Sequence, residues 1–262
     1  MTSPSASAAG GFFRPSVLSP PPSSSTATSA LPHPRSKPLK TGGNKESAFI
    51  RYVDERIRQI QRRFAKRGTG GTVTGDVKGY DNFADASKEV DQLVDVVWVS
   101  GTPSLQIAYL ISLALLINDF MAGFSPMPKA LFRILDKLDH AFASLLQGRD
   151  TETGEELPGF EGGRTVNATE KVRIYSMVQN ARIQVVDVMA KYDPLAHAEE
   201  NETESEMTEV MDTDVDEEFG LDDMEGAWDM QVAKVYDRTV VELGDSIGMR
   251  TENPLNANAS AS

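Results

Sequence analysis

The stretch WVSGTPSLQIAYLISLALLI, residues 98–117, is the least polar part of the chain and constrains its fold more than any other segment. A helix that crosses a bilayer needs about 20 mostly apolar residues. The apolar part here covers only residues 107–117, and Gln106, Asn118 and Asp119 fall within the window that a span would need. Such side chains are costly in hydrocarbon. We therefore interpret the stretch as the central helix of a soluble bundle, and a membrane-associated helical protein remains the alternative.

Amphipathic repeats on both sides of this stretch predict further helices. Apolar residues recur every three or four positions, which is the spacing of one buried helix face. Thr102 stands at the N-cap position of the central helix and Pro103 at its first helical position. In the segment 168–192 the apolar positions include Val172, Ile183 and Val186. The sequence therefore predicts an all-α protein, a single bundle of about five to six helices. The helical pattern begins at Ser47, and further helices are expected at about residues 80–99, from Pro103 onward, from Leu131 to Gly148, at 168–192 and at 226–248.

Composition separates this bundle from polar ends. Residues 1–45 are rich in Ser, Ala, Pro and Thr and contain no acidic residue, which predicts a disordered tail. The helical domain is expected over residues 46–195, interrupted by a flexible glycine-rich linker at 68–79 and a long loop at 147–165. A disordered acidic segment at 196–225, a C-terminal helix at 226–248 that packs on the domain, and a disordered tail at 249–262 complete the expected organisation.

Charge is distributed unevenly along the chain. The formal net charge is -13, of which residues after 198 carry about -16 and residues 1–198 about +3. Phe219, Leu221 and Trp228 stand among carboxylates, a composition typical of an acidic segment that docks on a basic surface through apolar anchors. That surface could belong to a partner or to the body of the same chain. A spacer that only solvates the chain is the alternative.

The loop GRDTETGEELPGFEGGRT is too long for a simple connection between two helices. Loops of this length inside a compact domain are usually functional or disordered. Phe160 could pin the loop to the body, while Arg149 and Arg164 offer bidentate contacts to carboxylates. The residues that we predict to bind a partner are Arg149, Phe160 and Arg164 in the loop, and Phe219, Leu221 and Trp228 in and beside the acidic segment.

The residue types present argue against an enzyme. The chain has no cysteine, which excludes iron–sulfur clusters and thiol nucleophiles. Its histidines, His33, His140 and His197, share no helical turn and lack metal-ligand spacing, and His140 is expected to be a surface or packing residue. The glycines of GTGGTVTGDVKG lack the Lys-Ser or Lys-Thr pair of a phosphate loop. We predict no catalytic residue, no cofactor and no metal ion.

The first helical segment carries a basic face opposite its apolar one. This face includes Arg51, Arg58, Arg62, Arg63 and Arg67. It could contact the phosphates of a nucleic acid, but no aromatic stacking platform accompanies it, so direct nucleic-acid binding is not expected. A protein-interaction adaptor with a nucleic-acid contact at this helix is kept as the alternative function.

Three segments together resemble a known family. They are SAFIRYVDERI, then VDVVWVSGTPSLQIAYLISLALLINDF, then KLDHAFASLLQGRDTETGEELPGFEGGR followed by TEKVRI. They are similar to the fungal accessory subunits of general transcription factor TFIIH, the transcription factor b subunit six family. The resemblance covers roughly residues 47–192 and the last helix.

This resemblance implies a nuclear, non-enzymatic protein that regulates transcription by RNA polymerase II. It implies association with TFIIH subunits, especially the XPB-type DNA helicase, and promotion of the release of that helicase from the complex. No small-molecule substrate and no membrane are expected. The resemblance assigns no functional residues, so the residues named above rest on physical reasoning alone.

Overall fold

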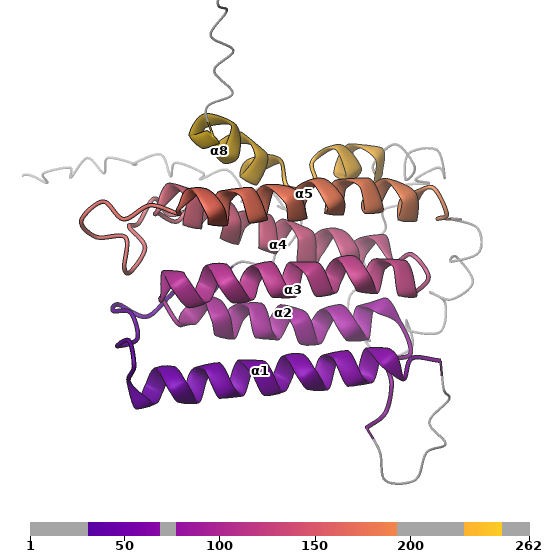
Figure 1. Ribbon diagram of the computed structural model, residues 1–262. Coiled ribbons are helices and arrows are strands. Elements are labelled where there is room, and N and C mark those ends of the chain that lie inside the picture. Colours follow the sequence, from indigo (N-terminus) through magenta and orange to yellow (C-terminus); the bar gives the residue numbers. More distant parts are fainter. Residues whose placement is uncertain (1–30, 69–76, 193–227, 248–262) are drawn as a thin grey trace, which may run out of the picture.

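The computed structural model describes residues 31–68, 77–192 and 228–247, and these residues form an all-α bundle as the sequence predicts. Helices α1 to α5 run side by side with alternating direction, and α8 lies beyond α4 and α5 (Figure 1). One isolated β-bridge joins Arg149 to Glu156. The named helices are α1 (Asn44–Ala65), α2 (Phe83–Val99), α3 (Pro103–Gly123), α4 (Pro128–Gln147), α5 (Ala168–Met189) and α8 (Asp237–Ile247).

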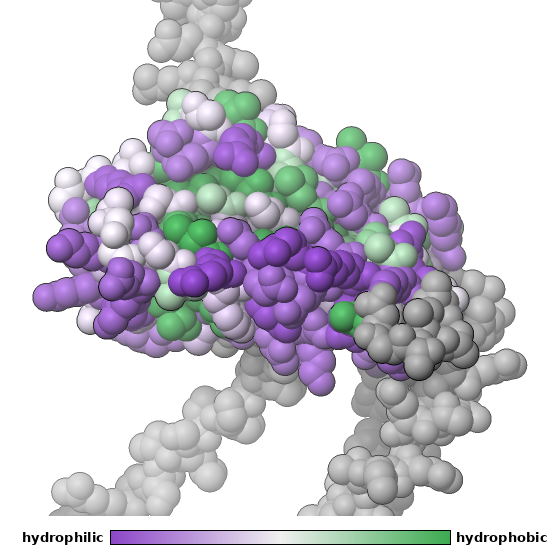
Figure 2. All heavy atoms as spheres, turned by 60° about the horizontal axis from the view of Figure 1, so that its bottom comes forward, coloured by the Kyte–Doolittle hydropathy of each residue, from purple (hydrophilic) through white to green (hydrophobic). Residues whose placement is uncertain are grey.

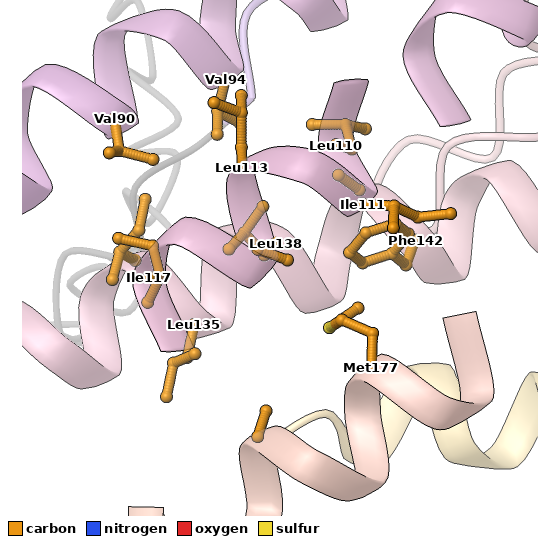
Figure 3. Close-up of a cluster of buried hydrophobic side chains, with 14 of the residues drawn as sticks. Val90, Val94, Leu110, Ile111, Leu113, Ile117, Leu135, Leu138, Phe142 and Met177 are labelled. Carbon is orange, nitrogen blue, oxygen red and sulfur yellow. The ribbon is translucent and has the colours of Figure 1, made fainter. Parts of the chain in front are cut away.

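The core forms around α3, which contacts α1, α2, α4 and α5. Figure 3 shows Leu110, Leu113 and Ile117 of this helix among apolar side chains of α2, α4 and α5. Each buried Leu or Ile side chain stabilises the fold by about 1.5–3 kcal/mol. By length and composition α3 could also cross a membrane, yet 61% of its apolar window is buried inside the bundle. This burial favours the interpretation of the apolar residues 107–117 as part of a core helix.

Residues 31–43 lie against the bundle, although the sequence analysis placed them in the disordered tail. The amide of Arg35 donates to the Val99 carbonyl at 3.2 Å, which satisfies a carbonyl at the end of α2. The amide of Leu39 donates to the Thr102 hydroxyl at 2.8 Å, and the Leu39 side chain is buried. Thr102 therefore holds this segment, and its side chain makes no N-cap hydrogen bond to α3. Residues 1–30 lie outside the described residues.

An ion cluster around the buried Lys137 joins α4 to α2. Lys137 is only 1% exposed, and its Nζ lies 2.9 Å from Asp91 Oδ1 and 2.7 Å from Asp95 Oδ1. A buried ammonium group needs such partners because its desolvation is otherwise uncompensated. The apolar periodicity of this segment did not predict that Lys137 is buried.

The apolar residues of α5 do not all face the core. Ile174, Val178 and Val185 are buried, but Val172, Ile183 and Val186 are exposed, and the helix ends at Met189 rather than near Tyr192. The prediction of one apolar face was therefore wrong for its outer residues. The reason is that, among the described helices, α5 packs extensively only on α3 and α8. No described residue covers the remaining part of its circumference.

The C-terminal element is broken, where the sequence predicts one helix over 226–248. Residues 228–233 are helical, a turn follows at 234–236, and α8 begins at Asp237. Tyr236 adopts a positive φ of 55° and is buried, with its ring 6.3 Å from the ring of Phe142. A non-glycine residue in this conformation carries strain, which the packing of its ring offsets.

Asp139 of α4 caps the N-terminus of α8, although it belongs to another helix. Its carboxylate accepts hydrogen bonds from the Thr239 amide at 2.8 Å, the Thr239 hydroxyl at 2.6 Å and the Arg238 amide at 3.2 Å. These donors belong to the first turn of α8, where amides have no partner within the helix. Burial raises the pKa of Asp139 above its ordinary value, although the hydrogen bonds from Thr239 and Arg238 oppose that change.

We expect Asp139→Ala to lower the free energy of unfolding by about 2 kcal/mol, because it removes the charged acceptor of the cap. Amide exchange in α8 should accelerate more than exchange in α3. The control is Asp136→Ala, which removes only the half-exposed partner of Arg238 and should cost about 1 kcal/mol or less. Equal effects of both substitutions in denaturant titrations and exchange would contradict the cap.

Candidate functional site

The loop between α4 and α5 folds back on the end of α4. Gly148 ends the helix in the left-handed conformation, with φ 74°, and its amide donates to the Ser144 carbonyl at 2.9 Å. The Leu157 amide donates to the Gly148 carbonyl at 3.0 Å. Together with the bridge from Arg149 to Glu156, these bonds close residues 149–156 into a compact turn.

Asp150 organises the tip of this turn. Its Oδ1 accepts from the amides of Glu152 at 2.8 Å and Thr153 at 3.0 Å, and it lies 3.4 Å from the Nε2 of the buried His140. The Nδ1 of that ring lies 3.5 Å from Glu152 Oε1. Partial burial disfavours ionisation of Asp150, but the two amides and the His140 ring outweigh it and hold its pKa below the ordinary value. His140 is thus a packing residue beneath the loop, one of the two roles expected for it.

Phe160 fixes the second half of the loop. Its side chain is 3% exposed and lies so close to Gly148 that a Cβ there would be 3.0 Å from the ring. The preceding residue, Gly159, also packs tightly on the bundle, because a Cβ at this position would lie 2.8 Å from Pro103, at the start of α3. The ring therefore anchors the loop, as expected, and it offers almost no surface to a partner in this conformation.

Arg149 and Arg164 are both exposed and flank this anchored part of the loop. A guanidinium group presents donors in a fixed plane that matches a carboxylate or phosphate. A side chain on a well-anchored loop loses less conformational entropy on binding than one on a mobile loop. The loop thus combines two exposed arginines with a support fixed by Asp150, Leu157 and Phe160.

Of the three remaining predicted contact residues, Trp228 is among the described residues. Trp228 is half-buried and stacks on Phe132 of α4, with ring centroids 5.6 Å apart and planes 15° apart. Phe219 and Leu221 lie outside the described residues. The structure therefore brings Trp228 to the N-terminal half of α4, whereas the loop arginines stand beyond the C-terminal end of that helix (Figure 1).

The basic face of α1 is narrower than the sequence suggests. Arg63 pairs with Glu89 of α2, and the Arg67 guanidinium lies 4.0 Å from the Phe64 ring and donates to the Gly123 carbonyl. The exposed arginines that remain on one stripe are Arg51, Arg58 and Arg62, of which Arg58 pairs with Glu55 at 2.8 Å. Figure 2 shows hydrophilic side chains gathered over this side of the bundle.

We expect Phe160→Ala to lower the free energy of unfolding by about 3 kcal/mol, since it leaves a cavity under the loop. Trypsin should then cut after Arg149 and Arg164 faster than in the parent chain, because the loop has lost its anchor. The neighbouring exposed residue provides the control, Glu161→Ala, which should change neither property. Limited proteolysis read by mass spectrometry measures this, and unchanged cleavage in Phe160→Ala would show that the ring does not hold the loop.

Within residues 31–68, 77–192 and 228–247, no group of three or more His, Cys, Asp or Glu side chains is placed to hold a metal ion. Neither the curated proteins nor the solved structures include a match to this chain. A family model does match, over residues 79–244, which is more than half of the chain and runs from just before α2 into α8. That family is described as subunit 11 of the general transcription factor TFIIH, and the chain belongs to it.

Proposed function

We propose that this chain is a non-catalytic nuclear accessory subunit of TFIIH that binds its XPB-type DNA helicase. By binding, it promotes dissociation of the helicase from the complex and so regulates transcription by RNA polymerase II. Membership of the TFIIH subunit family supports the association with the complex. The identity of the helicase as partner, and the dissociation, are the parts that experiment must test.

The observation that carries the proposed contact is the loop between α4 and α5. Its exposed arginines, Arg149 and Arg164, stand on a support fixed by buried side chains and turn hydrogen bonds. Such a surface fits carboxylates on a protein partner. The acidic segment, with Phe219 and Leu221, is proposed as a second contact, for which a basic surface on the helicase would be the complement.

The test uses purified TFIIH immobilised through a subunit other than the helicase. The full chain should bind and increase the fraction of helicase released into solution, and the double variant Arg149→Glu with Arg164→Glu should release less. Lys129→Glu with Arg133→Glu is the matched control, since both residues are exposed on α4 and it makes the same change of charge. A variant lacking residues 199–225 measures the contribution of the acidic segment.

Capture of TFIIH without any effect on the helicase would retain the family assignment and overturn the helicase contact. Equal loss of release in the loop variant and in the α4 control would show that net charge, rather than the loop, determines binding.

A second candidate function is a nucleic-acid contact through α1. The observation in its favour is that Arg51, Arg58 and Arg62 recur at seven- and four-residue spacing on one exposed stripe. If this stripe binds duplex DNA, Arg51→Glu with Arg62→Glu should weaken binding strongly, and affinity should fall steeply with added salt. The control Arg173→Glu, on α5, should change affinity little. Fluorescence anisotropy measures both, and equal affinities of the parent and the α1 variant would exclude this function.

A further inference from the structure

The outer side of α5 carries an exposed apolar stripe. Val172 is 57% exposed, Tyr175 39%, Ile183 62% and Val186 54%. Their spacing of three, eight and three residues keeps them on one side of a helix with 3.6 residues per turn, with Gln179 between them. Isolated exposed apolar residues are ordinary, whereas four on one side of a helix, in two pairs separated by Gln179, are typical of a docking surface. The stripe extends over about 21 Å.

Basic residues border this stripe. Lys171 and Arg182 lie on the side that faces the C-terminal element, where Arg182 donates to the Val235 carbonyl at 3.2 Å. Arg173 lies on the other side, and Lys191 follows the end of α5. Asp187 is the acidic residue among the exposed positions of α5, since Glu170 is engaged in the capping box with Asn167. An occupant with acidic residues beside apolar anchors therefore complements the stripe.

The chain contains a segment with this composition shortly after α5. Residues 196–227 contain fourteen acidic residues and neither lysine nor arginine. Interspersed among them are apolar residues able to meet an apolar stripe, which are Met207, Val210, Met211, Val215, Phe219, Leu221 and Met224.

We propose that residues 196–227 dock on the exposed stripe of α5 in the isolated chain. Apolar residues of the segment contact Val172, Tyr175, Ile183 and Val186, and its carboxylates lie near Lys171, Arg173 and Arg182. This inference concerns the chain without TFIIH, so it stands or fails independently of the proposed helicase contact.

The attachment points of the segment favour this occupant over a separate molecule. The chain leaves α5 after Met189 and is again described from Trp228, and both points lie toward the same end of the bundle (Figure 1). From Tyr192 to Met207 alone, an extended chain spans about 50 Å, more than twice the length of the stripe. Because the segment is tethered to α5 itself, its effective concentration at the stripe is of the order of millimolar, so weak complementarity suffices.

The basic stripe of α1 is the competing surface for the same carboxylates. On α1 the large exposed apolar residue is Tyr52, whereas α5 offers four such residues along one side. Figure 2 shows the same contrast, with hydrophilic side chains over α1 and hydrophobic ones gathered beyond it, on the side of α3 and α5. A segment with several apolar anchors therefore fits α5 better.

The experiment exploits the absence of cysteine from the chain. A nitroxide label is attached to the single cysteine of Asn180→Cys, beside the stripe, or of Tyr52→Cys, on α1. The full chain is also labelled with carbon-13 at the methionine methyl groups. The methyl signals of Met207, Met211 and Met224 should lose most of their intensity with the label at position 180 and keep it with the label at position 52.

Two further variants separate docking from chance proximity. Ile183→Ser with Val186→Ser should restore the three signals, and the matched control Val241→Ser, an exposed valine on α8, should not. At about 1 M sodium chloride, where the screening length is about 3 Å, the signals should also recover in part. Unchanged signals with the label at position 180, or equal losses from both labels, would overturn the proposal, as would losses that persist in the serine variant.

A mixture of two chains tests for a second copy at the stripe. One chain carries the nitroxide but no carbon-13, and the other carries carbon-13 methionine but no nitroxide. No loss of signal in this mixture is the expected result. Loss of the methionine signals there would assign the contact to another molecule and overturn docking within one chain.

Discussion

The burial of α3 is the constraint on which the rest of the bundle depends. A helix that is apolar around most of its circumference requires neighbours around most of it. Here α1, α2, α4 and α5 supply them, although one side of α3, with Leu115 44% exposed, stays uncovered by the described residues. Short connections at the ends of α2 and α3 make α2, α3 and α4 run in alternating directions. The corner between α2 and α3 is in turn covered by residues 31–43, which satisfy backbone and hydroxyl groups there.

Much of this arrangement was predictable because it is periodic. The apolar pattern identified the principal helices, the central position of α3 and the anchoring of the loop by Phe160. The break at residues 234–236 was not predictable, because it depends on a carboxylate, Asp139, that is distant along the chain. The burial of Lys137 was missed for the same reason, since its partners lie on α2.

The two predicted groups of contact residues illustrate the limit of pattern analysis for function. Arginines and an aromatic ring in one loop seemed equivalent in the sequence, but the structure gives them different tasks. Phe160 is buried against the bundle, whereas the side chains of Arg149 and Arg164 are exposed to solvent. For α5 the prediction was wrong in the opposite sense, because Val172, Ile183 and Val186 were expected in the core and are exposed. Periodicity reports which residues share a face, and only the number of neighbouring elements decides which faces are covered.

The contact between Asp139 and Thr239 also has a consequence for the time course of synthesis. The two residues are 100 positions apart, so α4 leaves the ribosome well before the helix that its carboxylate caps. At about 5–20 residues per second, the interval is roughly 5–20 s. During that interval the side of α4 that α8 will cover has no covering helix, although hydrophobic collapse takes only microseconds. A nascent chain of this kind therefore leaves that side of α4 open to aggregation, and to capture by chaperones, until α8 is made.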